Sequence, residues 1–205
     1  MSISLSLEPQ QEIAGEIPVD MEQVRRPQYG RYLDELDPGQ VFEHPRGFTF
    51  DTTNMLDFAR TYMQTNPLYL NEQYARAHGF DSLPASPQMV FNVTLSLGVQ
   101  NDSEKAIANL GYYQVQFLRP VYAGDTLRAF TKVLERKDRG ADKPGIARSR
   151  TVGLNQDNEV VLQYERKLMV AWRGDRLPTT PAAPVTVDFP GEEEPQLNLP
   201  LADCD

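Results

Sequence analysis

The residues that could carry acid–base or metal chemistry are few in this chain of 205 residues. Two histidines occur, His44 and His78, and the single cysteine is Cys204. His78 ends a short helical pattern just before Gly79, where a cation would suit the negative end of the helix dipole. A zinc site would need mainly carboxylates here, and no ligand spacing supports one. We therefore expect no metal site and a capping role for His78.

Three further side chains suggest hydrolytic chemistry, and each has a simpler interpretation. Ser86 precedes Pro87, and a capping serine with proline in the first turn is an ordinary helix start. Glu72 and Asp81 lie just before the apolar segment 87–100, which itself contains no Asp or Glu. We interpret Ser86 as a cap and both acids as solvated surface groups.

Helical patterns occupy the first half of the central region. A capping Asp51 precedes apolar residues at helical spacing, and Pro67 is expected to close that helix. Residues 71–78 form a shorter pattern that Gly79 stops. Residues 87–99 are apolar on most sides, which is typical of a helix that other elements enclose.

Strand-forming residues dominate the second half. Segments rich in β-branched and aromatic residues predict five strands, at residues 42–50, 107–118, 126–136, 146–155 and 160–172. One apolar helix followed by long antiparallel strands favours a sheet curled around that helix. The pattern therefore predicts an α+β fold.

The acidic charge lies at the two ends of the sequence. Residues 1–30 hold five acids and two bases, and residues 174–205 hold seven acids, one base and six of the sixteen prolines. The 17 acids and 17 bases of residues 31–173 balance. We expect a flexible leader over 1–30, one folded domain over 31–173, and an acidic, proline-rich tail over 174–205 that is dispensable for folding.

Composition also limits the compartment and the partners. The net charge of −9 gives no basic excess for binding a phosphate backbone, so a general nucleic-acid partner is disfavoured. No run approaches the roughly 20 apolar residues that a membrane-spanning helix needs. The first residues lack the basic start of a secretory signal, and one cysteine cannot form an intrachain disulfide. We expect a cytoplasmic protein without a membrane partner.

Several segments resemble a known family. Residues 117–127, FLRPVYAGDTL, resemble the strand–turn–strand signature of MaoC-like hydratases and dehydratases, which have the hot-dog fold. Residues 106–112, 149–156 and 160–166 resemble the first half of mesaconyl-CoA hydratase (β-methylmalyl-CoA dehydratase) type enzymes, which carry two hot-dog units. The resemblance covers about residues 30–173. It implies an antiparallel sheet wrapped around a central apolar helix, and an acyl-CoA substrate with no further cofactor.

The resemblance is weakest where the family places its catalytic pair. Residues 62–69, YMQTNPLY, align with the family segment Gly-Asp-x-Asn-Pro-x-His, so that Gln64 replaces the aspartate and Tyr69 replaces the histidine. Asn66 and Pro67 match the family. Gln64 has no useful proton affinity, and an unperturbed tyrosine titrates near pH 10. The catalytic residues are therefore left unassigned, with Gln64, Asn66 and Tyr69 as candidates for the substrate cleft.

Basic side chains on two strands that are expected to pair suggest a site for the phosphates of coenzyme A, since guanidinium groups pair well with phosphate oxygens. The candidates are Arg148, Arg150, Arg166 and Lys167. The alternative is a charged outer sheet face balanced by Glu159 and Glu165.

The resemblance implies a hydratase/dehydratase subunit acting on an enoyl- or 3-hydroxyacyl-CoA thioester. In one hypothesis the chain is itself a hydro-lyase. In the other it shapes the acyl pocket while a second hot-dog unit supplies the Asp/His pair, as a homodimer or a heterodimer. The substitutions favour the second hypothesis. A thioesterase is less favoured, because hot-dog thioesterases often carry an acid on or near the central helix, whereas residues 87–100 contain none.

Overall fold

A computed structural model describes residues 28–140 and 143–173 of the chain. Five antiparallel strands form one sheet in the order β1-β3-β4-β5-β2. The strands are β1 (Val41–Thr49), β2 (Ala106–Phe117), β3 (Thr126–Lys137), β4 (Gly145–Leu154) and β5 (Val160–Val170). Each of the five predicted strands is confirmed to within two residues at either end.

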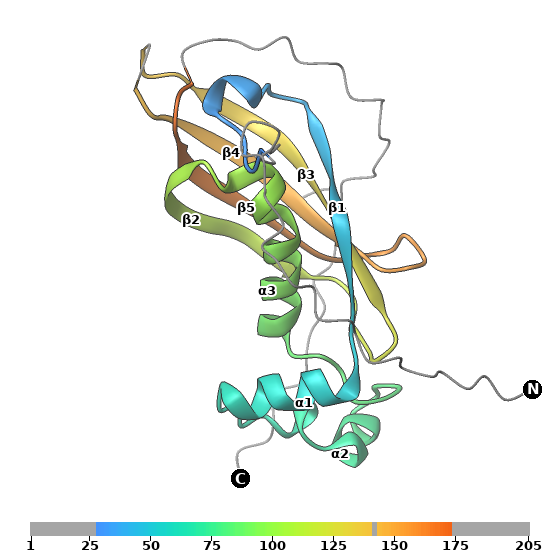
Figure 1. The fold of residues 1–205 in the computed structure, drawn as a ribbon. Helices are drawn as coiled ribbons and strands as arrows, with labels where there is room; N and C mark the ends of the chain where they lie inside the picture. Colours follow the sequence, from blue (N-terminus) through green and yellow to red (C-terminus); the bar gives the residue numbers. More distant parts are fainter. Residues whose placement is uncertain (1–27, 141–142, 174–205) are drawn as a thin grey trace, which may run out of the picture.

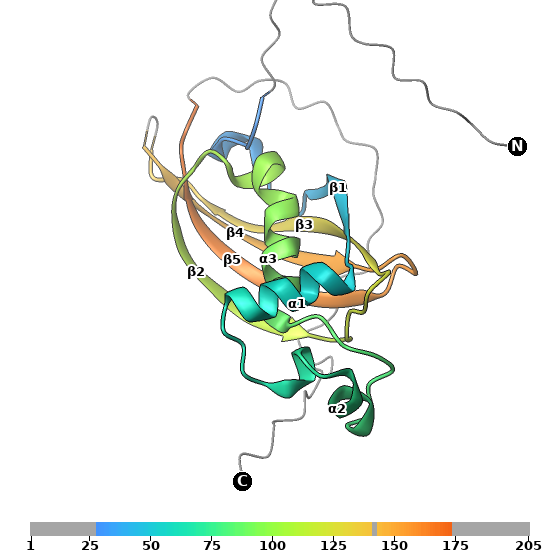
Figure 2. The same ribbon diagram turned by 60° about the horizontal axis from the view of Figure 1, so that its bottom comes forward.

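The helices lie on one side of this sheet. They are α1 (Thr52–Thr61), α2 (Glu72–Ala77) and α3 (Pro87–Gly98), with short 3-10 turns η1 (Leu33–Glu35) and η2 (Pro67–Tyr69) and a π-helical turn η3 (Val99–Ser103). The sheet curls around α3, and α1 and α2 lie at the end where α3 begins (Figure 1). β2 bends furthest around the helix (Figure 2).

The central helix forms where the sequence provides a start signal and an apolar surface. The Ser86 hydroxyl accepts a hydrogen bond from the Met89 amide at 3.3 Å, and Pro87 occupies the first turn, so the predicted capping role of Ser86 is confirmed. The helix packs very close to the sheet at Gly153, where a Cβ atom would lie only 3.0 Å from Thr94 Oγ1. Glycine on β4 therefore allows α3 to approach the sheet.

Two apolar clusters hold the layers together. The larger lies between α3, α1 and the sheet, and its most buried members are Phe50, Met55, Val90, Val121, Leu127, Val161, Leu162 and Tyr164. A second cluster lies near η1, and includes Leu33, Phe42, Val133, Leu168 and Val170. Burial of this apolar surface is the main stabilising contribution to the fold.

Pro67 does not close the first helix, contrary to the sequence-based expectation. α1 ends at Thr61, because Met63 adopts a left-handed conformation with φ 51°. The Gln64 amide then donates to the Ala59 carbonyl at 2.9 Å, and the Met63 amide donates to the Arg60 carbonyl at 3.2 Å. This pair of bonds is a Schellman motif. Pro67 instead begins η2.

The leader over 1–30 falls almost wholly outside the described residues, as do the tail over 174–205 and Cys204. In the part of the chain that the structure describes, no helix is both long and apolar enough to cross a membrane.

Candidate functional site

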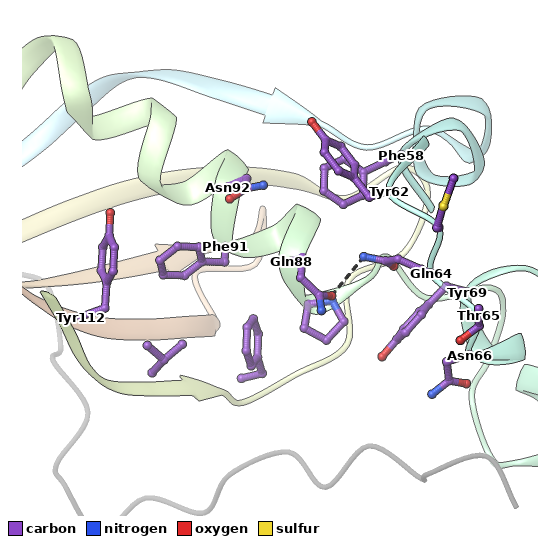
Figure 3. Close-up of a pocket in the computed structure, with 14 residues that line it drawn as sticks. Phe58, Tyr62, Gln64, Thr65, Asn66, Tyr69, Gln88, Phe91, Asn92 and Tyr112 are labelled. Atoms are coloured by element: carbon purple, nitrogen blue, oxygen red, sulfur yellow. Dashed lines mark hydrogen bonds between the residues drawn. The ribbon is translucent and has the colours of Figure 1, made fainter. Parts of the chain in front are cut away.

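An open groove of about 920 Å³ lies where α1, η2, the first turns of α3 and the end of β2 meet (Figure 3). Its lining residues are aromatic, aliphatic, amide or hydroxyl side chains without formal charge. They are Phe58, Tyr62, Met63, Gln64, Thr65, Asn66, Tyr69, Pro87, Gln88, Phe91, Asn92, Tyr112, Val115 and Phe117. All three predicted cleft residues, Gln64, Asn66 and Tyr69, are among them.

Gln64 reaches the groove because of the way α1 ends. The Schellman motif reverses the chain at Met63, so the side chain of Gln64 is directed toward the start of α3 (Figure 3). Its Nε2 group donates to Gln88 Oε1 at 3.2 Å. The Gln64 Oε1 atom is buried and has no hydrogen-bond partner. A buried acceptor of this kind favours a ligand that donates a hydrogen bond.

Asn66 and Tyr69 take different roles at the same end of the groove. Asn66 caps η2, since its Oδ1 accepts from the Leu68 amide at 3.0 Å. Tyr69 is only 8% exposed, and burial raises the pKa of its phenol above the usual 10. The hydroxyl of Tyr69 therefore stays protonated at neutral pH, and it can donate a hydrogen bond but cannot act as a base there.

Aromatic side chains form the opposite end of the groove. Phe91 on α3 packs edge-on against Tyr112 of β2, with ring centroids 5.0 Å apart. β2 has a register shift between Tyr113 and Gln116, and Gln114 adopts φ 49°. This bulge breaks the alternation of side chains, so that Tyr112, Val115 and Phe117 all line the groove.

Sequence reasoning missed the lining residues of α3, including Gln88 and Asn92. These two are four residues apart and so share one helical face. The signal that could have identified them is this pair of amides on a helix otherwise apolar on most sides. The aromatic residues Tyr112 and Phe117 also line the groove, although the sequence analysis did not identify them as cleft residues.

Three of the four basic residues considered for phosphate binding, Arg148, Arg150 and Lys167, lie on the outer face of the sheet, whereas Arg166 does not. Arg148 and Arg150 bind the buried Glu165, with Arg148 Nε–Oε2 at 2.7 Å and Arg150 Nη2–Oε1 at 2.6 Å. Arg166 is buried on the helix side of the sheet, with Nη2 3.3 Å from Asp102 Oδ1. Lys167 lies opposite Arg148 in the sheet, and the two side chains line one hollow outside the groove. Most of this charge is balanced within the sheet, and binding of coenzyme A phosphates here stays a prediction.

The two histidines lie outside the groove. His78 is the C-terminal cap of α2 and its Nδ1 donates to the Tyr74 carbonyl at 2.8 Å, which confirms its capping role. His44 is a residue of β1, and its side chain is buried. Its Nε2 lies 2.8 Å from Thr131 Oγ1 and its Nδ1 lies 3.2 Å from Asn101 Nδ2. Burial lowers the pKa of His44, so the imidazole is neutral at neutral pH.

The acids considered above are also accounted for. Glu72 pairs with Arg76 at 2.8 Å across one turn of α2. Asp81 is exposed, and its amide donates to the Tyr122 hydroxyl at 3.2 Å. Neither acid lines the groove.

A five-stranded antiparallel sheet curled around one helix defines the class of hot-dog proteins. The structure of a MaoC domain protein dehydratase from Chloroflexus aurantiacus matches with a TM-score of 0.71 at 29% identity, over 87% of this chain and 50% of that one. A Mycobacterium tuberculosis protein with a double hot-dog fold matches with a TM-score of 0.61 at 28% identity, over 73% of this chain and 46% of that one. The predicted hot-dog fold is confirmed.

Within this class the chain belongs to the mesaconyl-CoA hydratase family, whose model matches residues 18–197. A mesaconyl-CoA hydratase from Cereibacter sphaeroides is 33% identical over 162 residues, which are 79% of this chain and 47% of that protein. The chain spans about half the length of the curated relatives it matches. The family predicted from the sequence is therefore confirmed.

Proposed function

We propose that this chain is the substrate-pocket unit of a hydratase/dehydratase that acts on an enoyl- or 3-hydroxyacyl-CoA thioester. In this proposal a second hot-dog unit supplies the aspartate and histidine that handle water and the α-proton. Family membership supports the reaction class. The match to about half of each relative supports a partnership of two units.

The observation that carries the proposal is the composition of the groove. Amide and phenol side chains occupy the positions where the family motif has its acid/base pair, and burial keeps the Tyr69 phenol protonated. A positioned acid or base typically contributes about 10²–10⁴-fold to a rate. A groove that lacks such a group binds and orients a thioester, and contributes little to proton transfer itself.

The groove has the groups needed for positioning. The Tyr69 hydroxyl and the Gln88 amide are neutral donors that suit a thioester carbonyl or the amides of the pantetheine arm. The aromatic end around Phe91 and Tyr112 suits an apolar acyl chain. Holding the substrate in a reactive orientation lowers the barrier without any ionisable group.

The outer edge of the sheet is suited to a second unit. β2 pairs only with β5 among the described elements, so its other edge carries unpaired backbone groups. Three large apolar side chains on β2 are also exposed, Ile107 at 57%, Leu110 at 40% and Tyr113 at 47%. Pairing at β2 would cover these side chains and extend the sheet into the second unit.

Loss of absorbance from a conjugated enoyl-CoA tests the proposal. The purified chain alone is expected to hydrate crotonyl-CoA or mesaconyl-CoA at least about 100-fold more slowly than the assembled pair. Adding a hot-dog unit with the intact Asp/His pair should restore turnover. A rate of about 10 s⁻¹ with this chain alone, close to the median for enzymes, would overturn the proposal and show that the substituted residues carry out the chemistry.

A further inference from the structure

We propose that the groove selects an uncharged acyl group, so that the thioester it prefers lacks the free carboxylate that a mesaconyl group carries. This inference rests on the proposed function and names the substrate class of the same groove. The inferred substrate therefore differs from mesaconyl-CoA, which gives the family its name.

Charge is the first argument for an uncharged acyl group. All fourteen lining residues are formally neutral, so no cation among them can compensate a carboxylate. The arginines considered for phosphate binding do not line the groove, since Arg148 and Arg150 bind Glu165 and Arg166 faces Asp102. Moving an uncompensated carboxylate from water into such a groove is unfavourable.

The free acceptor on Gln64 is the second argument. Its buried Oε1 atom has no partner, while Nε2 is already bound to Gln88. A carboxylate placed there would bring two acceptors together. An amide N–H of the pantetheine arm, or the hydroxyl of a 3-hydroxyacyl group, would instead supply the missing donor.

Size and shape are the third argument. The groove, at about 920 Å³, lies near the upper end of the range of about 300–1,000 Å³ for small-molecule sites. Phe58, Phe91, Tyr112 and Phe117 provide broad apolar surface along it. A medium-length aliphatic chain fills such a surface with dispersion contacts, which a short, charged acyl group would not make.

Equilibrium binding of a matched ligand pair tests the inference without turnover. Octanoyl-CoA and suberyl-CoA are both saturated and have equal chain length, and they differ by the terminal carboxylate. Calorimetric titration of the full chain is expected to show octanoyl-CoA binding at least about tenfold more tightly. The coenzyme A portion is common to both ligands and cancels in the ratio.

A second part of the binding experiment places a lysine in the groove. Gln88→Lys introduces a cation beside Gln64 at an exposed position and should narrow or reverse the preference. Gln73→Lys changes the same residue type on the exposed face of α2, outside the groove, and should leave the ratio unchanged.

The outcomes separate the inference from the proposed function. Equal or tighter binding of suberyl-CoA by the unmodified chain would overturn the inference and leave the pocket role intact. An equal response of the ratio to both lysine variants would also overturn it, because selection would then reflect overall charge. Binding of neither thioester would overturn the proposed function together with the inference.

Discussion

Gln64 and Tyr69 show how a small change of residue type alters what a site can do. Both side chains reach the groove, where the family motif would place an aspartate and a histidine. An amide cannot serve as a general acid or base near neutral pH, and a buried phenol with a raised pKa cannot act as a base there. The two residues retain hydrogen bonding, which is sufficient for binding and orientation.

Buried His44 gives the fold a predictable response to pH. It faces Asp102, Arg166 and Arg31, and burial lowers its pKa below the usual 6.5. The unfolded chain therefore binds a proton at His44 before the folded chain does as the pH falls. The free energy of unfolding should be fully retained above pH 6.5 and should decrease below it, by at most about 1.4 kcal/mol per pH unit from this group.

Urea unfolding at a series of pH values from neutral to mildly acidic measures this response. His44→Gln should flatten the part of the pH dependence that His44 contributes, whatever its effect on stability at neutral pH. The same measurement on His78→Gln gives the part of the pH dependence that depends on the other histidine. If the free energy of unfolding of His44→Gln has the same slope against pH as that of the unmodified chain, the pH dependence does not come from His44.

Among the helices and strands, the sequence predicts the features that depend on residues close together in the chain. Enrichment in β-branched and aromatic residues predicted every strand, and the predicted caps Asp51 and Ser86 begin α1 and α3. The turn at Met63 and the bulge at Gln114 escaped prediction, since neither residue is the glycine that usually marks a left-handed conformation. Both irregularities shape the groove.

The residues of the candidate site also fall into a group that the sequence predicted and a group that it did not. Gln64, Asn66 and Tyr69 were predictable because a sequence motif marks them. Phe91, Asn92 and Val115 were not, because they join the groove only when α3 and β2 are brought together in three dimensions. The sequence indicated Glu165 as a residue that could balance the charge of the arginines on the sheet. Its burial, at 1% exposure, was not predicted, because it depends on the sheet that surrounds it.

Replacement of Met63 by glycine tests the turn that ends α1. Met63 is 85% exposed, so its side chain contributes little packing, while its left-handed backbone is unfavourable for any residue with a Cβ atom. Met63→Gly should raise the free energy of unfolding by about 1 kcal/mol in urea denaturation. Met63→Ala keeps the Cβ atom and should stay close to the unmodified chain. A destabilised glycine variant would contradict the proposed strain.

The whole molecule presents an edge that a second unit would cover. Ile107, Leu110 and Tyr113 are exposed along β2, and the same strand curves around α3 to form one wall of the groove. A partner at this edge would lie next to the substrate groove. Assembly and substrate binding are therefore expected to depend on the same strand.

Light scattering coupled to size exclusion tests whether the purified chain associates at micromolar concentration. The expected mass is that of at least two chains of 23.2 kDa. Ile107→Lys places a charge on the exposed edge and should shift the mass toward that of one chain. Gln73→Lys on α2 should leave the mass unchanged. A mass of one chain for the unmodified protein would contradict self-association through β2.

The turnover number of the assembled enzyme after changes at Gln64 and Tyr69 tests the central claim most directly. If these residues bind and orient the thioester without transferring a proton, Gln64→Ala and Tyr69→Phe should raise KM and lower kcat by less than about tenfold. The matching substitution of the second unit's aspartate should lower kcat by about 10²–10⁴-fold. A fall of that size in kcat from Gln64→Ala or Tyr69→Phe would contradict the account and place the chemistry in this chain.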